Sequence, residues 1–162
     1  DHTLVCYSYS KSLSLPGQRM GYVLVPQSVE DFPLLYAALG GAGRALGYVC
    51  APSLFQFVAQ RCTVVTADLS IYRQNRDTLL TALRGMGYSC AQPEGAFYLF
   101  PQTPEPDAGA FCAKARELDL ILVPGDSFGC GGHVRISYCV QPELIQRALP
   151  KFEKLARMYG LM

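Results

Sequence analysis

The sequence predicts an α/β chain that ends in a compact α+β unit. Short apolar runs bounded by turn residues predict strands, and longer segments with apolar residues at helical spacing predict helices. After Gly87 the expected order is strand, helix, strand, strand, helix, which can enclose a core of its own. The 162 residues, 50% of them hydrophobic, allow one domain, or one small domain with part of another.

Two strand-like runs open the chain. Residues 3–7 and 20–25 are apolar and are expected to form buried strands. A serine-rich polar loop that contains Lys11 lies between them, followed by a turn at Pro16-Gly17. Because the chain reaches a strand within three residues of Asp1, it looks like an entry into the middle of a fold.

Two helices are expected next, at 29–39 and at 53–66, with Ser53 as the N-cap of the second. Both are apolar on most faces, which predicts packing on two sides. The segment between them is expected to be broken by its glycines, which are Gly40, Gly41, Gly43 and Gly47.

A clearly amphipathic helix is expected at 69–86, because Ile71, Leu79 and Leu83 follow helical spacing. Glycines at 85 and 87 are expected to stop it. The remaining elements expected are a strand at 96–101, a helix at 107–118, a strand at 120–124, a strand at 133–140 and a helix from Pro142. Pro150 predicts a kink or a restart within that last helix.

Composition excludes several classes of protein. With 14 Lys+Arg against 13 Asp+Glu the net charge is +1, so no basic stripe indicates a nucleic acid or an anionic membrane as partner. No apolar run reaches membrane-spanning length. Seven cysteines, mostly in apolar or small-residue surroundings, are typical of buried free thiols in a reducing compartment. A soluble cytoplasmic protein with a small-molecule partner is therefore expected.

Lys11 differs from the other three lysines, which lie on expected helices among other charges. It follows a strand within a run of serines, and Arg19 comes shortly after. Strand ends beside hydroxyl-rich turns commonly bind phosphate, a planar arginine can bind it with two hydrogen bonds, and a lysine amine held nearby can attack an aldehyde. The residues alone leave open a second interpretation, a surface loop with an ordinary lysine.

Arg135 is expected to project from a strand at 133–140. Strand alternation places it on one face with Ser137 and Cys139, opposite the apolar residues of the same strand. No acidic residue adjoins it in sequence, so its charge requires an anion from elsewhere. That anion is either a substrate carboxylate or an acidic side chain brought close by the fold.

Three further patterns are given structural interpretations. Residues 41–47 resemble a dinucleotide-binding loop but follow a helix rather than a strand, so they are not evidence for NAD. Cys130, His133 and Cys139 lack a second paired motif, so no metal site is expected. The tyrosines and phenylalanines are interpreted as core and interface residues.

The run Ser8-x-Ser10-Lys11, followed by Pro16-Gly17-x-Arg19, closely resembles the cofactor-lysine segment of class I/II aminotransferases, which have the aspartate aminotransferase fold and use pyridoxal 5'-phosphate. In that family the phosphate-binding arginine comes eight residues after the lysine. The resemblance implies that Lys11 is the Schiff-base lysine and proton carrier. It implies that Ser8 and Arg19 bind the cofactor phosphate, with Ser10 as a further candidate.

Later segments resemble the same family. Residues 72–77 are similar to its long connecting helix, and 95–98 to the strand that enters its small domain. Residues 123–129 followed by Val134-Arg135-Ile136-Ser137 resemble the segment ending in the arginine that binds the substrate α-carboxylate. The resemblance therefore implies a remnant of the large cofactor-binding domain at 1–68, and the connecting helix with the C-terminal small domain at 69–162.

The activity implied is transfer of an amino group from an amino acid to a 2-oxo acid, in a homodimer. The family's phosphate-binding turn, ring-stacking aromatic residue and Asp partner of the pyridine nitrogen have no candidates in residues 1–162, so this stretch alone is expected to be inactive. Two alternatives stay open: a carbon-sulfur lyase on the same scaffold, and a non-catalytic aminotransferase-like domain used for sensing or assembly.

Overall fold

The computed structural model describes residues 2–162 and shows two compact units. The N-terminal unit is Asp1–Asp68, described from residue 2 onward, and the C-terminal unit is Leu69–Met162. Within the described residues, no helix combines the length and the apolar character needed to cross a membrane.

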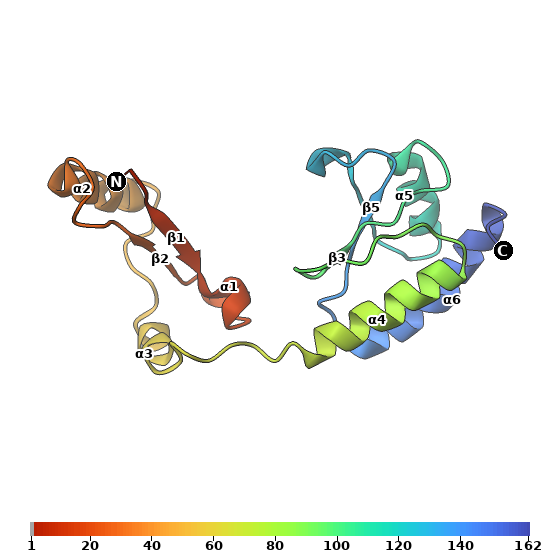
Figure 1. Cartoon of the computed structure of the whole chain (residues 1–162), viewed down its shortest axis with the longest axis horizontal. Coiled ribbons are helices and arrows are strands. Elements are labelled where there is room, and N and C mark those ends of the chain that lie inside the picture. Colours follow the sequence, from red (N-terminus) through yellow and green to blue (C-terminus); the bar gives the residue numbers. More distant parts are fainter. Residues whose placement is uncertain (1) are drawn as a thin grey trace. The chain divides into compact units, whose positions relative to one another are not determined.

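The N-terminal unit is built on a hairpin with helices after it (Figure 1). Its strands pair antiparallel, with Val5 opposite Leu24 at the open end and Ser8 opposite Gly21 at the closed end. In chain order its elements are β1 (Val5–Ser8), α1 (Tyr9–Ser12), the 3₁₀ turn η1 (Pro16–Gln18), β2 (Gly21–Leu24), α2 (Phe32–Ala45) and α3 (Ser53–Arg61).

This unit has almost no core. Among its described residues only Met20 and Ala59 are buried. The prediction of buried strands is wrong for this structure, because every residue of β1 and β2 is exposed and, among residues 2–162, no third strand pairs with the hairpin. The expected two-sided packing of the helices is also wrong, since large apolar side chains stay exposed on them, among them Leu34, Tyr36, Leu54 and Phe57. A two-stranded hairpin is marginal without further packing.

The helix boundaries of this unit differ from those expected: α2 is Phe32–Ala45 rather than 29–39, and α3 ends at Arg61 rather than at residue 66. Helix α2 continues through Gly40, Gly41 and Gly43 and ends near Gly47, which has a φ of +85°. A glycine inside a helix costs about 1 kcal/mol relative to alanine but does not forbid the helix, whereas the left-handed backbone at Gly47 ends it. Ser53 is the first residue of α3 rather than its N-cap, which is Pro52.

The C-terminal unit combines a three-stranded sheet with three helices. The strand order is β3-β5-β4, with both pairings antiparallel. Figure 1 shows α4 and α6 lying side by side along their lengths. The elements are α4 (Ser70–Gly85), β3 (Tyr98–Leu99), α5 (Ala108–Glu117), β4 (Val123–Pro124), the 3₁₀ turn η2 (Asp126–Phe128), β5 (Val134–Ser137) and α6 (Pro142–Met158).

The strands of this unit are shorter than expected. Strand β3 begins only at Tyr98, two residues after Ala96, whose φ of 59° is left-handed. A left-handed Asp119, with φ of 56°, precedes the second expected strand, which pairs with β5 only at Val123 and Pro124. Helix α6 runs through Pro150 without a restart, as one proline removes a single N–H donor from a 17-residue helix.

One core holds the C-terminal unit together. Its members come from every helix and strand except β4, and the most deeply buried large side chains are Leu79, Leu83, Leu99, Phe111, Val134 and Leu155. A buried polar residue, Asn75 of α4, crosses to the end of the sheet. Its side-chain amide donates to the carbonyl oxygens of Tyr138 (3.1 Å) and Val140 (2.7 Å). This amide ties α4 to the segment that follows β5.

We expect Asn75→Ala to lower the free energy of unfolding by about 1–3 kcal/mol, because two carbonyl oxygens lose their donor. Urea unfolding of the protein measures this loss. The neighbouring Gln74 is exposed, so Gln74→Ala is the matched control and should change stability by less than about 0.5 kcal/mol. Equal effects of the two substitutions would show that the Asn75 bridge contributes nothing.

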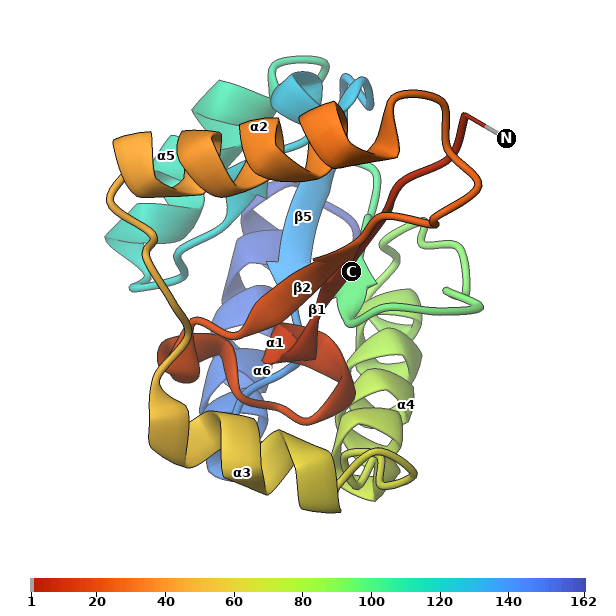
Figure 2. The same cartoon turned by 90° about the vertical axis from the view of Figure 1, so that its left-hand side faces the viewer.

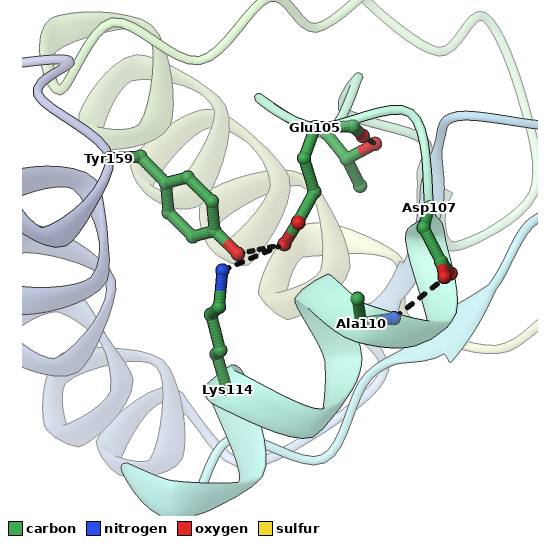
Figure 3. Close-up of polar contacts among 6 residues, drawn as sticks. Glu105, Asp107, Ala110, Lys114 and Tyr159 are labelled. Carbon is green, nitrogen blue, oxygen red and sulfur yellow. Dashed lines mark hydrogen bonds and ion pairs between the residues drawn. The ribbon is translucent and has the colours of Figure 1, made fainter.

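A polar cluster fastens the end of the chain to α5 (Figure 3). Lys114 donates to Glu105 Oε1 at 3.3 Å and lies 4.5 Å from the centre of the Tyr159 ring, and the Tyr159 hydroxyl donates to the same Glu105 oxygen. The hydrogen bond with Tyr159, together with Glu105, raises the pKa of Lys114. Glu105 and Tyr159 lie 9 and 45 residues from Lys114 in the chain, so helical position alone does not show these partners.

All seven cysteines are free thiols. Cys90 and Cys112 are buried, and burial raises the pKa of both thiols. Cys6, Cys50 and Cys139 are exposed, so the expectation of mostly buried cysteines does not hold.

Candidate functional site

The closed end of the β1–β2 hairpin gathers the residues expected to bind the cofactor. Pairing continues past the strands, as the Tyr9 N–H donates to the Met20 carbonyl at 3.1 Å. In Figure 2 the hairpin leads directly into α1. The segments carrying Lys11 and Arg19 therefore lie next to each other.

Ser8 caps α1. Its backbone is extended, with φ of −129° and ψ of 131°, and its Oγ accepts from the Ser10 N–H at 3.2 Å. A hydroxyl that accepts in this way still has its own hydrogen to donate. Ser8 can therefore offer one O–H donor to an anion, and Ser10 places a second hydroxyl in the same short helix.

Lys11 lies in the last turn of α1, within a short helix rather than in the polar loop that the sequence predicts. Its side chain is exposed in this structure. The next residue, Ser12, was not expected to matter. Its Oγ is buried and has no hydrogen-bond partner among residues 2–162, and a buried hydroxyl is ordinarily paired.

Arg19 follows the 3₁₀ turn in a left-handed conformation, with φ of 52° and ψ of 48°. Such a backbone is uncommon for a residue other than glycine and is often kept for function. Its Nη1 donates to the Pro16 carbonyl at 2.8 Å. A guanidinium has five N–H donors, so this bond leaves others for a phosphate.

These residues fit a bound phosphate ester beside an amine. The closed end of the hairpin offers serine hydroxyls, an arginine and a lysine, and the orphaned Ser12 Oγ indicates that a polar partner is missing from this region. Phosphate oxygens accept hydrogen bonds from such donors, and an arginine can supply two at once. These residues therefore have the hydrogen-bond donors that a phosphate needs and the amine that an aldehyde can react with, so they are chemically suited to a cofactor that carries both groups.

Gly21 allows the two strands to approach at this end. A Cβ atom there would lie 2.4 Å from the Tyr7 carbonyl oxygen, whereas one at Gly17 would meet nothing within 4 Å. We expect Gly21→Ala to destabilise the protein by about 1–3 kcal/mol, because the backbone must move apart. Gly17→Ala is the matched control, expected to change stability by less than about 0.5 kcal/mol. Thermal or urea unfolding measures both, and equal stabilities would contradict the close approach.

Arg135 belongs to the C-terminal unit, where it lies on the central strand β5. Val134 and Ile136 on either side are buried while Arg135 and Ser137 are only partly so, which confirms the alternation expected from sequence. Ser137 Oγ lies 3.0 Å from Cys139 Sγ on the same side. Within the described residues 69–162 the Arg135 guanidinium has no ion pair with a carboxylate.

Aromatic rings take the place of an acidic partner. The guanidinium carbon of Arg135 lies 4.5 Å from the centre of the Tyr98 ring and 4.4 Å from that of Phe128. Both distances are in the range of cation–π contacts. The general interpretation of the aromatic residues as core and interface overlooked this role, and strand spacing alone could not have shown which rings approach Arg135.

The N-terminal unit has a hairpin with Lys11 at its closed end, and the C-terminal unit is an α+β unit with Arg135 on its central strand. Together these units form part of an aspartate aminotransferase fold. The chain belongs to the aminotransferase class I and II family, whose model matches residues 1–152.

Known proteins of the family resemble the chain over nearly all of its length. An aspartate/prephenate aminotransferase from Thermus thermophilus is 29% identical over 159 residues, which cover 96% of this chain and 41% of that protein. The crystal structure of an amino transferase from Eubacterium rectale is 57% identical, with a TM-score of 0.86, over 98% of this chain and 40% of that one. An aspartate aminotransferase from Thermus thermophilus with maleate is 28% identical, with a TM-score of 0.73, over 95% of this chain and 41% of that one. The chain thus spans about two-fifths of the length of these relatives.

Proposed function

We propose that the protein containing this chain is a pyridoxal-phosphate-dependent aminotransferase that moves an amino group from an amino acid to a 2-oxo acid. The observation that carries the proposal is the closed end of the β1–β2 hairpin, where the segment with Ser8, Ser10 and Lys11 lies next to the segment with Arg19, in a chain of the aminotransferase family. A homodimer is part of the proposal and can be tested by light scattering of the full-length protein.

Four residues would hold the cofactor. Ser8, Ser10 and Arg19 would donate hydrogen bonds to its phosphate, and Lys11 would bind its aldehyde through Nζ. When bound, pyridoxal phosphate supplies an electron-withdrawing ring that makes the α-hydrogen of an attached amino acid acidic.

Lys11 has a second task, the movement of a proton. Its amine would take the proton from the substrate α-carbon and deliver it to the C4' carbon of the cofactor, and the reverse movement would follow when the 2-oxo acid accepts the amino group. Proton transfer by a positioned side chain accelerates a reaction by about 10²–10⁴-fold.

Arg135 would bind the α-carboxylate that every amino acid and 2-oxo acid carries. A bidentate pair fixes both position and direction, which orients the α-hydrogen for removal. The names of the relatives support a carboxylate ligand: one acts on aspartate and prephenate, and another was crystallised with maleate, a dicarboxylate.

We propose further that residues 1–162 alone are inactive. The N-terminal unit buries only two of its described residues and leaves the faces of its hairpin exposed, so Lys11 is not enclosed within it. A cofactor that must be shielded from water needs a surrounding pocket.

The test is an incubation of the full-length protein with pyridoxal phosphate, an amino acid and a 2-oxo acid. The proposal predicts that the amino acid corresponding to the 2-oxo acid appears and that ammonia does not. Release of ammonia and a thiol from a sulfur-containing amino acid would instead identify a carbon-sulfur lyase. Absence of any turnover across a panel of amino acids would favour a sensing or assembly role.

A further inference from the structure

In the described part of the C-terminal unit, aromatic rings contact the Arg135 guanidinium and no carboxylate forms an ion pair with it. Tyr98 and Phe128 approach its central carbon at 4.5 and 4.4 Å. Within residues 69–162, the Arg135 guanidinium makes no hydrogen bond or ion pair. Aromatic rings attract a cation through their faces and accept no strong hydrogen bond, so the N–H donors stay available to a ligand.

Tyr98 is placed by the sheet. It stands opposite Ser137 in the pairing of β3 with β5, so Arg135, two residues away on the same face, is its diagonal neighbour. Diagonal neighbours are within reach when the side chains are aromatic or long. The backbone pairing therefore sets the distance between the Tyr98 ring and the guanidinium.

Phe128 is placed by the tight loop after β4. Its N–H donates to the Gly125 carbonyl at 2.8 Å, and the Gly125 N–H donates to the His133 carbonyl at 2.8 Å. A Cβ at Gly125 would lie 2.2 Å from the Cys130 carbonyl oxygen, so the loop closes this tightly only with glycine. Phe100 meets the Phe128 ring edge-on, with the ring centres 6.1 Å apart. Phe128 is thus held in place although it is 49% exposed.

We propose that Tyr98 and Phe128 are positioning residues, which hold the Arg135 guanidinium by their ring faces. The guanidinium would then already have the orientation in which its N–H groups bind the substrate carboxylate. The inference rests on the proposed role of Arg135 as the carboxylate anchor. An acidic partner would compete with the substrate for the same donors, whereas a ring restrains the guanidinium and leaves them unused.

The test is substrate binding by variants of the full-length protein loaded with pyridoxal phosphate. The probe is the des-amino analogue of the best amino donor, a carboxylic acid that can bind but cannot react. Calorimetry gives its dissociation constant, and steady-state kinetics give KM and kcat for the donor. Phe128→Leu and Tyr98→Leu are each expected to raise the dissociation constant of the probe and the KM of the donor about three- to tenfold, because that factor corresponds to the free energy of one cation–π contact. The kcat should stay within about twofold of normal.

Conservative variants and a matched control separate positioning from folding. Phe128→Tyr and Tyr98→Phe keep a ring and should bind the probe like the unaltered protein. Tyr159→Leu removes the ring beside Lys114, another cation–π contact of the same unit, and should leave the dissociation constant unchanged. Thermal melting is recorded for every variant, and Phe128→Met supplies a second non-aromatic side chain if leucine lowers the melting temperature.

The possible results distinguish this inference from the proposed function. If Arg135→Lys weakens probe binding while Phe128→Leu, Phe128→Met and Tyr98→Leu do not, the positioning role is wrong and the anchor role stands. If Arg135→Lys also binds the probe normally, the anchor role itself is wrong, and the positioning role is overturned with it. Weaker binding in the non-aromatic variants and normal binding in the aromatic ones supports the inference.

Discussion

Replacing Lys11 by alanine in the full-length protein is expected to lower kcat for amino-group transfer by at least about a thousandfold. The substitution removes both the amine that binds the cofactor aldehyde and the base that moves the α-proton, and the second loss alone is worth about 10²–10⁴-fold. Single-turnover and steady-state rates with the best amino donor measure the effect. Stability should hardly change, because the Lys11 side chain is exposed.

The matched control is Lys154→Ala, which removes an exposed lysine from α6. Its kcat should equal that of the unaltered protein. Added methylamine should restore part of the activity of Lys11→Ala if a missing amine is the cause. A Lys11→Ala protein that turns over at a rate close to normal would contradict the assignment of Lys11.

The second large effect is expected at Arg135. Arg135→Met should lower kcat/KM by about 100-fold or more, because each hydrogen bond to a charged group contributes about 1.5–3 kcal/mol and two are lost. Much of the loss should appear in KM for both the amino acid and the 2-oxo acid, since both carry the carboxylate. Arg135→Lys keeps the charge but not the bidentate geometry and should give an intermediate loss.

Arg147→Met, at an exposed arginine of α6, is the control for the change of charge. It should leave kcat/KM within about twofold of normal. If Arg135→Met lowered kcat/KM for amino acids but not for 2-oxo acids, the common-carboxylate explanation would be wrong.

Much of the C-terminal unit follows from local pattern. The amphipathic stripe of α4, the Asp107 cap that accepts from Ala110 N–H at 3.0 Å, and the alternation along β5 each depend on residues close in sequence. Strand ends were misplaced where a single left-handed residue, Ala96 or Asp119, interrupts the pairing. Local propensity does not predict the left-handed conformation of such residues, because the surrounding tertiary structure imposes their backbone dihedral angles.

In the candidate site, too, some features follow from residues close in sequence and others depend on tertiary contacts. The spacing between Lys11 and Arg19 indicated their relation, and the hairpin register brings their segments together. The roles of Tyr98, Phe128 and Ser12 could not be predicted, because they depend on which side chains meet across strands and turns. The burial of the N-terminal strands was wrongly predicted. Apolar composition shows that a strand is suited to packing under other elements, but it does not show that the described residues supply those elements.

The most direct test of the account is an absorbance spectrum of the full-length protein with pyridoxal phosphate, followed by borohydride reduction and peptide mass spectrometry. We expect a band near about 400 nm, and after reduction the cofactor mass on the peptide that contains Lys11. The Lys11→Ala variant should show neither. No band in the unaltered protein, or a cofactor attached to one of the other lysines, would contradict the assignment of Lys11 as the cofactor-binding residue.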